Sequence, residues 1–185
     1  WPPASLSGAP ATASAGCASM DTWQAIDDAA PEVARQLLAR ACGSSRWVEQ
    51  MMDRRPFGGR AALLSAARTV WDALDERAWR EAFTHHPKIG DRDALRARFP
   101  ATHALSAREQ AGVDGATDAV LDALADGNRR YEARFGYIFI VCASGLGAGE
   151  MLSMLHLRLS NDPAREILLA AAEQAKITAL RLTFG

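Results

Sequence analysis

One strand-like segment, in a chain whose other segments have helical patterns, constrains the fold more than any other feature. Residues 137–143 read Tyr-Ile-Phe-Ile-Val-Cys-Ala, the β-branched and aromatic composition of a buried strand. A strand needs a neighbouring strand for its backbone hydrogen bonds, and the sequence offers no second convincing one. We therefore predict an all-α, compact single-domain bundle of about eight helices, with residues 137–143 as one buried extended connector. The backbone groups of this connector need partners, and a ligand is one candidate.

The other segments carry apolar residues at helical spacing, separated by Gly, Pro, Ser and Asp. Trp47, Trp71, Trp79 and Phe83 lie in these apolar faces, so we assign them to the core. We predict helices over residues 31–41, from Ser44 or Ser45 to near residues 56–59, and over 60–74, with a further turn or two after Asp72 or Asp75. Further helices are predicted over 91–99, 117–134, 151–160 and 163–182.

Composition excludes several classes of protein. The chain has 185 residues, of which 49% are hydrophobic and 23% charged, and this suits one soluble globular domain. A formal net charge of -1 gives no support for binding nucleic acid or an anionic membrane, and no apolar run reaches the ~20 residues of a membrane span. Three scattered cysteines favour a reducing compartment, so we expect a cytoplasmic protein.

The first nineteen residues differ in composition from the rest. Residues 1–19 are rich in Pro, Ala, Ser and Gly but lack the basic start and apolar centre of a signal peptide. We interpret them as a disordered tail or an expression remnant, with Met20 as a natural start. Residues 20–185 then form the folded domain.

The strongest candidate for chemistry is the turn His85-His86-Pro87-Lys88-Ile89-Gly90-Asp91. An unperturbed imidazole titrates at about 6.5, so His86 can move protons near neutral pH. Pro87 biases His86 away from helical geometry and should hold it on a rigid turn. Downstream, Ser106 and Glu109 form a capping-box pattern that opens a helix, whose free N–H groups suit an anionic ligand.

Other motifs indicate chemistry less clearly. The run Gly145-Leu146-Gly147-Ala148-Gly149 lacks the Lys and Ser/Thr of a phosphate loop and the βαβ unit of a dinucleotide fold. His85, His86, His103 and His156 do not have the spacing of a metal site on one helix face. Arg181 falls in the last turn of the final helix, where a simple interaction with the helix dipole on a solvated end is equally reasonable.

Several segments together resemble the 2-oxo-4-hydroxy-4-carboxy-5-ureidoimidazoline (OHCU) decarboxylase family of urate degradation. They are His86-Pro87-Lys88-Ile89-Gly90, residues 106–112, residues 128–142, Glu150-Met151-Leu152 and residues 176–182. The likeness extends from about Met20 to Leu182. It implies an all-α fold, a homodimer, and decarboxylation of OHCU to (S)-allantoin with no metal or organic cofactor. A hydroxyisourate hydrolase is a possible functional partner.

The resemblance also implies roles for individual residues. His86 is the expected catalytic acid/base, and Glu109 either fixes its tautomer or accepts a ureido N–H. The expected substrate-binding residues are Pro87, Ser106, Ala107, Arg108, Glu109, Gln110, Phe139, Ile140, Val141, Cys142, Ala143 and Arg181, with Arg181 binding a carboxylate and residues 139–143 contributing backbone groups. Leu146 and the Gly147-Ala148-Gly149 run depart from the family pattern and leave the mobility of that loop open.

The substrate class explains why these residue types suffice. It carries a carboxylate next to a C=N bond that can accept the electron pair left by CO2, so the protein need only orient it and deliver a proton. The alternative function is a non-catalytic helical module that binds partners through its apolar faces.

Overall fold

The computed structural model describes the backbone of residues 21–86 and 107–184, with side chains from residue 118 onward in the second range. Within these ranges every regular element is a helix, which confirms the predicted all-α fold. The helices are α1 (Thr22–Asp28), α2 (Pro31–Ala41), α3 (Ser45–Met52), α4 (Arg60–Asp72), α5 (Glu76–Thr84), α7 (Ala107–Phe135), α8 (Ala148–Leu159) and α9 (Pro163–Phe184). The predicted tail over residues 1–19 and the predicted helix over residues 91–99 lie outside the described residues. None of the described helices is long and apolar enough to cross a membrane.

Helix starts follow the capping residues read from the sequence. The Ser44 hydroxyl accepts the Trp47 N–H at 3.4 Å and begins α3, and the Asp75 carboxylate accepts the Ala78 N–H at 3.0 Å and begins α5. Pro163 is the first residue of α9, directly after Asp162. Of the two residues proposed to separate α4 from α5, Asp72 ends the first helix and Asp75 caps the second.

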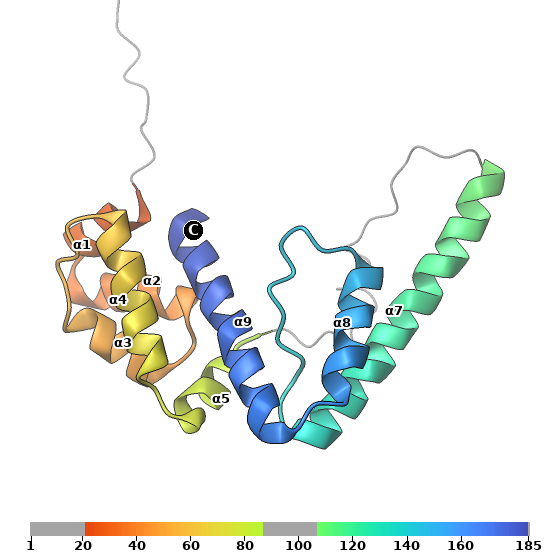
Figure 1. Cartoon of the computed structure of the whole chain (residues 1–185). Helices are drawn as coiled ribbons and strands as arrows, with labels where there is room; N and C mark the ends of the chain where they lie inside the picture. The colour runs from red at the N-terminus through yellow and green to blue at the C-terminus, as the bar shows by residue number, and fades with distance from the viewer. Residues whose placement is uncertain (1–20, 87–106, 185) are drawn as a thin grey trace, which may run out of the picture.

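Helices α1, α2, α4 and α5 pack against α9, α3 packs against α2, α4 and α5, and together these helices form one arm of a V-shaped molecule (Figure 1). Indole N–H groups join the helices of this arm. Trp47 donates to the Ala67 carbonyl at 3.1 Å, and Trp71 donates to the Ala171 carbonyl of α9 at 2.9 Å. Trp47 and Trp71 are buried, as predicted from their place in apolar faces.

Helices α7 and α8 form the other arm, and α7 is longer than predicted. We expected a capped start near Ser106 and a separate helix from about residue 117, whereas α7 runs unbroken from Ala107 to Phe135. The reason is that Gly112 and Gly115 lower helix propensity by only about 1 kcal/mol each, and no proline interrupts residues 101–162. A Cβ on Gly127 of α7 would lie 2.6 Å from Leu155 Cδ2 of α8, so the two helices approach closely there.

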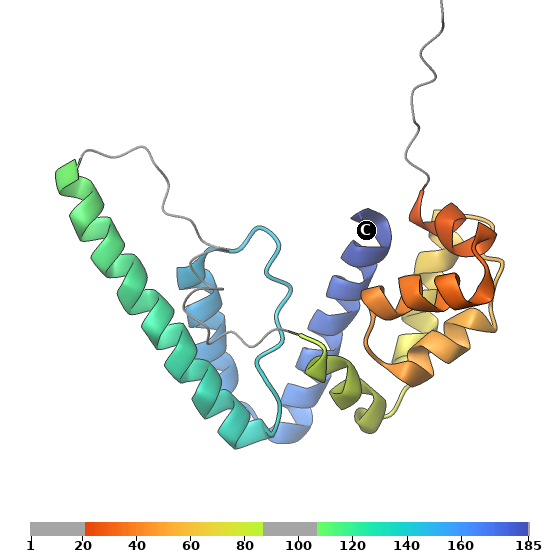
Figure 2. The same ribbon diagram turned by 180° about the vertical axis from the view of Figure 1, so that it is seen from behind.

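The segment between α7 and α8 is the predicted extended connector. Residues 138–143 form no strand, and residues 137–141 are buried. The connector leaves the C-terminal end of α7 at the base of the V and runs between α8 and α9 (Figures 1 and 2). It therefore lies where the two arms meet.

Candidate functional site

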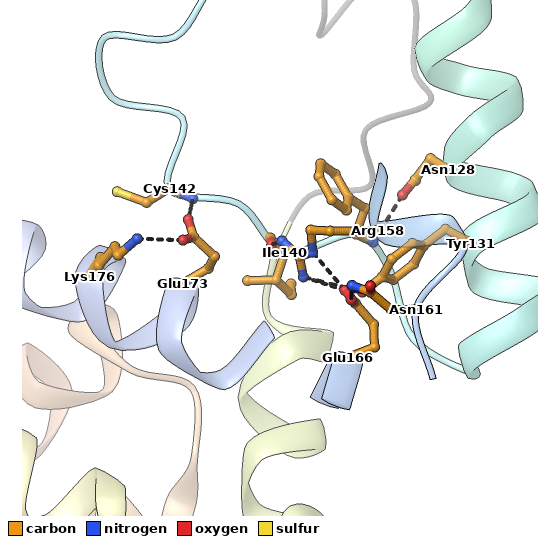
Figure 3. A network of polar contacts seen from close by, with 10 residues as sticks. Asn128, Tyr131, Ile140, Cys142, Arg158, Asn161, Glu166, Glu173 and Lys176 are labelled. Atoms are coloured by element: carbon orange, nitrogen blue, oxygen red, sulfur yellow. Dashed lines mark hydrogen bonds and ion pairs between the residues drawn. The ribbon is translucent and has the colours of Figure 1, made fainter. Parts of the chain in front are cut away.

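Side chains from helices α7, α8 and α9 bind the backbone of the connector (Figure 3). Asn128 Oδ1 of α7 accepts the Phe139 N–H at 3.0 Å, and Glu173 Oε2 of α9 accepts the Cys142 N–H at 2.7 Å. Arg158 Nη1 of α8 donates to the Ile140 carbonyl at 2.7 Å. These three side chains supply hydrogen bonds that a neighbouring strand would supply in a sheet. They also occupy three of the backbone groups that we had considered available to a ligand.

Arg158 is part of a buried charged network. Its Nη2 lies 2.6 Å from Glu166 Oε1, and the side chains of Arg158 and Glu166 are 9% and 0% exposed. Asn161 Nδ2 donates to Glu166 Oε2 at 2.7 Å, and the Tyr131 hydroxyl donates to Glu166 Oε1. Burial raises the pKa of Tyr131 well above its ordinary range, so this hydroxyl keeps its proton. With each charge paired and hydrogen-bonded, the network meets the condition under which buried ions are tolerated.

A cavity of about 440 Å³ opens beside the connector. Its wall brings together candidates that are far apart in the sequence: His86 after α5, the connector, and Arg181 in the last turn of α9. The lining residues are His86, Phe139, Ile140, Val141, Cys142, Ala143, Ser144, Ile177, Leu180 and Arg181. Of the other candidates, Pro87 and Ser106 lie outside the described residues, as do the side chains of Ala107, Arg108, Glu109 and Gln110.

His86 follows the end of α5 and is half-buried against α9. Its Nε2 lies 2.5 Å from Gln174 Oε1, and Gln174 is fully buried. Burial lowers the pKa of His86 from its usual 6.5, and the positive charges of Arg181 and His85 lower it further, while the hydrogen bond with Gln174 partly opposes them. The imidazole is therefore neutral at neutral pH and can accept a proton.

Arg181 joins the cavity to the end of α2. Its Nη1 donates to the carbonyls of Arg40 and Ala41, each at 3.3 Å, where α2 has carbonyls without helical partners. These bonds hold the guanidinium at the cavity wall. Arg181 therefore both binds the C-terminal carbonyls of α2 and lines the cavity.

Sequence reasoning missed several polar residues at this site. They are Gln174, Glu173 and Arg158, which face the core or the connector. The sequence patterns of their helices gave no indication of a functional role for these positions. A usable signal was present in α9, because Gln174, Thr178 and Arg181 recur at intervals of four and three residues and so share one helix face. Asn128 lies in residues 128–142, one of the segments that resemble the family, but the sequence did not predict its hydrogen bond to Phe139.

Among residues 21–86 and 118–184, whose side chains the structure describes, no group of three or more His, Cys, Asp or Glu side chains could hold a metal ion.

The chain is similar to proteins of urate breakdown. It is 39% identical over 147 residues to the uric acid degradation bifunctional protein TTL of Arabidopsis thaliana, a match that covers 76% of this chain and 44% of that protein. It is 32% identical over 131 residues to 2-oxo-4-hydroxy-4-carboxy-5-ureidoimidazoline decarboxylase of Amia calva, covering 69% and 73% of the two chains. This chain thus spans less than half the length of the plant relative.

The chain is also similar to solved structures. A crystal structure of OHCU decarboxylase in the presence of (S)-allantoin matches with a TM-score of 0.64 and 34% identity, over 83% of this chain and 96% of that one. A crystal structure of (S)-allantoin synthase matches with a TM-score of 0.62 at 16% identity, over 88% of this chain and 53% of that one, which supports the fold alone. The OHCU decarboxylase family profile matches residues 27–183, and the chain therefore belongs to the OHCU decarboxylase family.

Proposed function

We propose that this chain catalyses the decarboxylation of OHCU to (S)-allantoin in urate degradation, with no metal or organic cofactor. The observation that carries the proposal is the shared cavity. A neutral imidazole at His86, a guanidinium at Arg181 and the connector backbone line one space of about 440 Å³. A proton-transfer group and a fixed cation together suit a substrate that carries a carboxylate and needs a proton.

The reaction requires few protein groups. The C–C bond to the carboxylate breaks, its electron pair passes into the adjacent C=N bond of the substrate, CO2 leaves, and one proton is taken up. The substrate thus provides its own electron sink. The protein must orient the ring, stabilise the electron-rich intermediate and deliver the proton to one face.

Each candidate residue receives a role in this proposal. His86 transfers protons, and Arg181 binds a carboxylate or a negative oxygen with its planar guanidinium. Backbone groups of residues 139–143 that are not bound by Asn128, Arg158 or Glu173 contact the ring and ureido amides. We assign the remaining roles, to Pro87, Ser106, Ala107, Arg108, Gln110 and the catalytic or tautomer-fixing Glu109, on the family resemblance.

The assembly and the cellular setting are part of the proposal. We infer a homodimer in the cytoplasm, working beside a hydroxyisourate hydrolase. The homodimer rests on the family resemblance. A partner activity is supported by the longer Arabidopsis relative, whose name describes a bifunctional protein of uric acid degradation.

The deciding experiment follows freshly generated OHCU by ultraviolet absorbance and by the handedness of its product. Because OHCU also decays without enzyme to racemic allantoin, an excess of the (S) form reports catalysis. We expect His86→Asn to remove most of the turnover, by about 10²–10⁴-fold, with the thermal midpoint little changed.

Two outcomes would contradict the proposal. Racemic product at the spontaneous rate from the wild-type chain would leave the non-catalytic helical binding module as the better reading. Activity that is lost with EDTA and restored by zinc would replace the cofactor-free mechanism with a metal-dependent one.

A further inference from the structure

The contact between His86 and α9 specifies which imidazole nitrogen carries the proton. His86 Nε2 lies 2.5 Å from Gln174 Oε1, and a carboxamide oxygen can only accept a hydrogen bond. If Gln174 keeps this orientation, Nε2 must be the protonated nitrogen of the neutral ring. The lone pair then lies on Nδ1.

A second bond fixes the orientation of Gln174. Gln174 Nε2 donates to Thr178 Oγ1 at 3.2 Å, one turn further along α9. Gln174 is 0% exposed and Thr178 is 4% exposed, so water does not compete for these groups. Reversing the carboxamide would place an NH2 group against Nε2 and an oxygen against the Thr178 hydroxyl, and that hydroxyl would then have to donate to it.

The two contacts give one order of donation. His86 Nε2–H donates to Gln174 Oε1, and Gln174 Nε2 donates to Thr178 Oγ1. The chain of hydrogen bonds therefore runs from His86 to Gln174 and from Gln174 to Thr178.

We propose that Gln174 and Thr178 are positioning residues that hold neutral His86 as the Nε2–H tautomer, so that Nδ1 exchanges protons with the substrate. The assignment of the tautomer stands on the contacts alone. The role of Nδ1 in turnover rests on the proposed decarboxylation.

The tautomer is measured directly, without substrate, by long-range ¹H–¹⁵N correlation spectra of protein labelled with ¹⁵N-histidine. His86→Gln identifies the His86 signals among those of the four histidines. At a pH where the ring is neutral, we expect a protonated-type shift at Nε2 and an unprotonated-type shift at Nδ1. A protonated Nδ1 in the wild-type protein would overturn the inference.

Two variants test the positioning residues, with a matched control on the same helix. Gln174→Leu and Thr178→Val should each shift His86 toward a mixture of tautomers. Thr183→Val is the control, because the Thr183 hydroxyl bonds only the Ala179 carbonyl, at 2.8 Å within α9, among the contacts described. A wild-type tautomer ratio in both Gln174→Leu and Thr178→Val would contradict the inference. If Gln174→Leu fails to fold, Thr178→Val alone provides the test.

Kinetics provides a measurement that would not change if the role of Gln174 were purely structural. Gln174→Leu should lower kcat about 10–100-fold with little change in KM, as for other partners that orient a functional imidazole. Gln174→Glu should restore the tautomer, because a carboxylate also accepts from Nε2–H. Its negative charge should oppose the effects of Arg181 and His85 and move the acid limb of the pH–rate profile to higher pH.

Failure of this inference and failure of the proposed function are distinguishable. Inactivity of the wild-type chain on OHCU, with the Nε2–H tautomer present and lost in Gln174→Leu, would leave the positioning role standing. If the chain is active on OHCU but the His86 tautomer ratio is unchanged in the Gln174 and Thr178 variants, only the positioning role is contradicted.

Discussion

Arg181 has a structural contact and also lies in the proposed site. It binds the last carbonyls of α2 through Nη1 while lining the cavity beside His86. We predict that Arg181→Lys keeps the charge but loses the planar fork, so that substrate binding weakens by about 1–3 kcal/mol. Steady-state kinetics and thermal unfolding measured side by side check this. If both kinetics and stability are unchanged, Arg181 has no role in substrate binding and behaves as a residue on a solvated helix end.

Arg158 gives a second prediction at the residue scale. Arg158→Met leaves the fully buried Glu166 without its cation and the Ile140 carbonyl without its donor, so we expect a loss of about 3–5 kcal/mol in the free energy of unfolding. Adding Glu166→Leu removes the unpaired charge and should recover part of that stability. The double variant should still lose activity, because Ile140 remains without its donor.

Chemical denaturation and the OHCU assay separate these two effects. A loss below about 1 kcal/mol in Arg158→Met would mean that water or another group satisfies Glu166. Full activity in the double variant would mean that the connector keeps its shape without Arg158.

The residues that carry the site differ in how far sequence could identify them. The turn around His86 was selected from its own residues, and the family resemblance added its catalytic role. For Arg181, position in the last helical turn suited a solvated end equally well, and only the resemblance placed it in the site. Gln174 was not identified, because its role depends on a contact with His86 across 88 residues. Local pattern carries no information about such a contact.

At the scale of elements, the loop between α2 and α3 approaches the end of α5 very closely. A Cβ on Gly43 would lie 2.4 Å from His85 Cγ and 2.6 Å from His85 Cβ, and the latter cannot move without its backbone. We predict that Gly43→Ala displaces His85 and with it the His86 turn. The expected result is a loss of about 1–3 kcal/mol in stability together with a fall in kcat.

Gly59→Ala is the matched control for this close approach. A Cβ on Gly59 would meet nothing within 4 Å, so only the difference in N-capping, within about 1 kcal/mol, should appear. Equal losses in the two variants would show that the contact with His85 is not what demands glycine at position 43.

Helices were the elements that sequence predicted best, because caps and apolar periodicity are local. Residues 31–41 were matched by α2 at both ends, and Ser44, Asp75 and Pro163 marked helix starts. The division of α7 was wrong, because glycines weaken a helix without ending it. The connector was recognised as extended, yet its partners on three helices depend on tertiary packing and could not be read from its own residues.

At the scale of the whole molecule, the site lies where the two arms meet, and α9 contributes to both the core and the cavity wall. Burial of His86 in this region links stability to pH. The folded state keeps the ring neutral below its usual pKa of 6.5, whereas the unfolded state takes up a proton there. The unfolded state therefore binds more protons, and the stability due to His86 falls as pH drops from about 6.5 toward the lowered folded pKa.

The corresponding prediction compares wild-type and His86→Asn proteins by chemical denaturation over a pH series. The difference in free energy of unfolding should be constant above pH ~7.5 and should shift against the wild type below pH ~6.5, before levelling off under the folded pKa. A difference that stays constant across the acid range would show that the folded state does not suppress protonation of His86.

The extended connector has a consequence for how such a site can change over generations. In a β-sheet the partner of a backbone group is another backbone group, which no amino-acid replacement except one to proline can delete. Here Asn128, Arg158 and Glu173 are side chains, so a single codon change can release Phe139, Ile140 or Cys142. The shape of the cavity wall is thus open to stepwise mutation, and the same openness makes it vulnerable to inactivating substitutions far from any bound ligand.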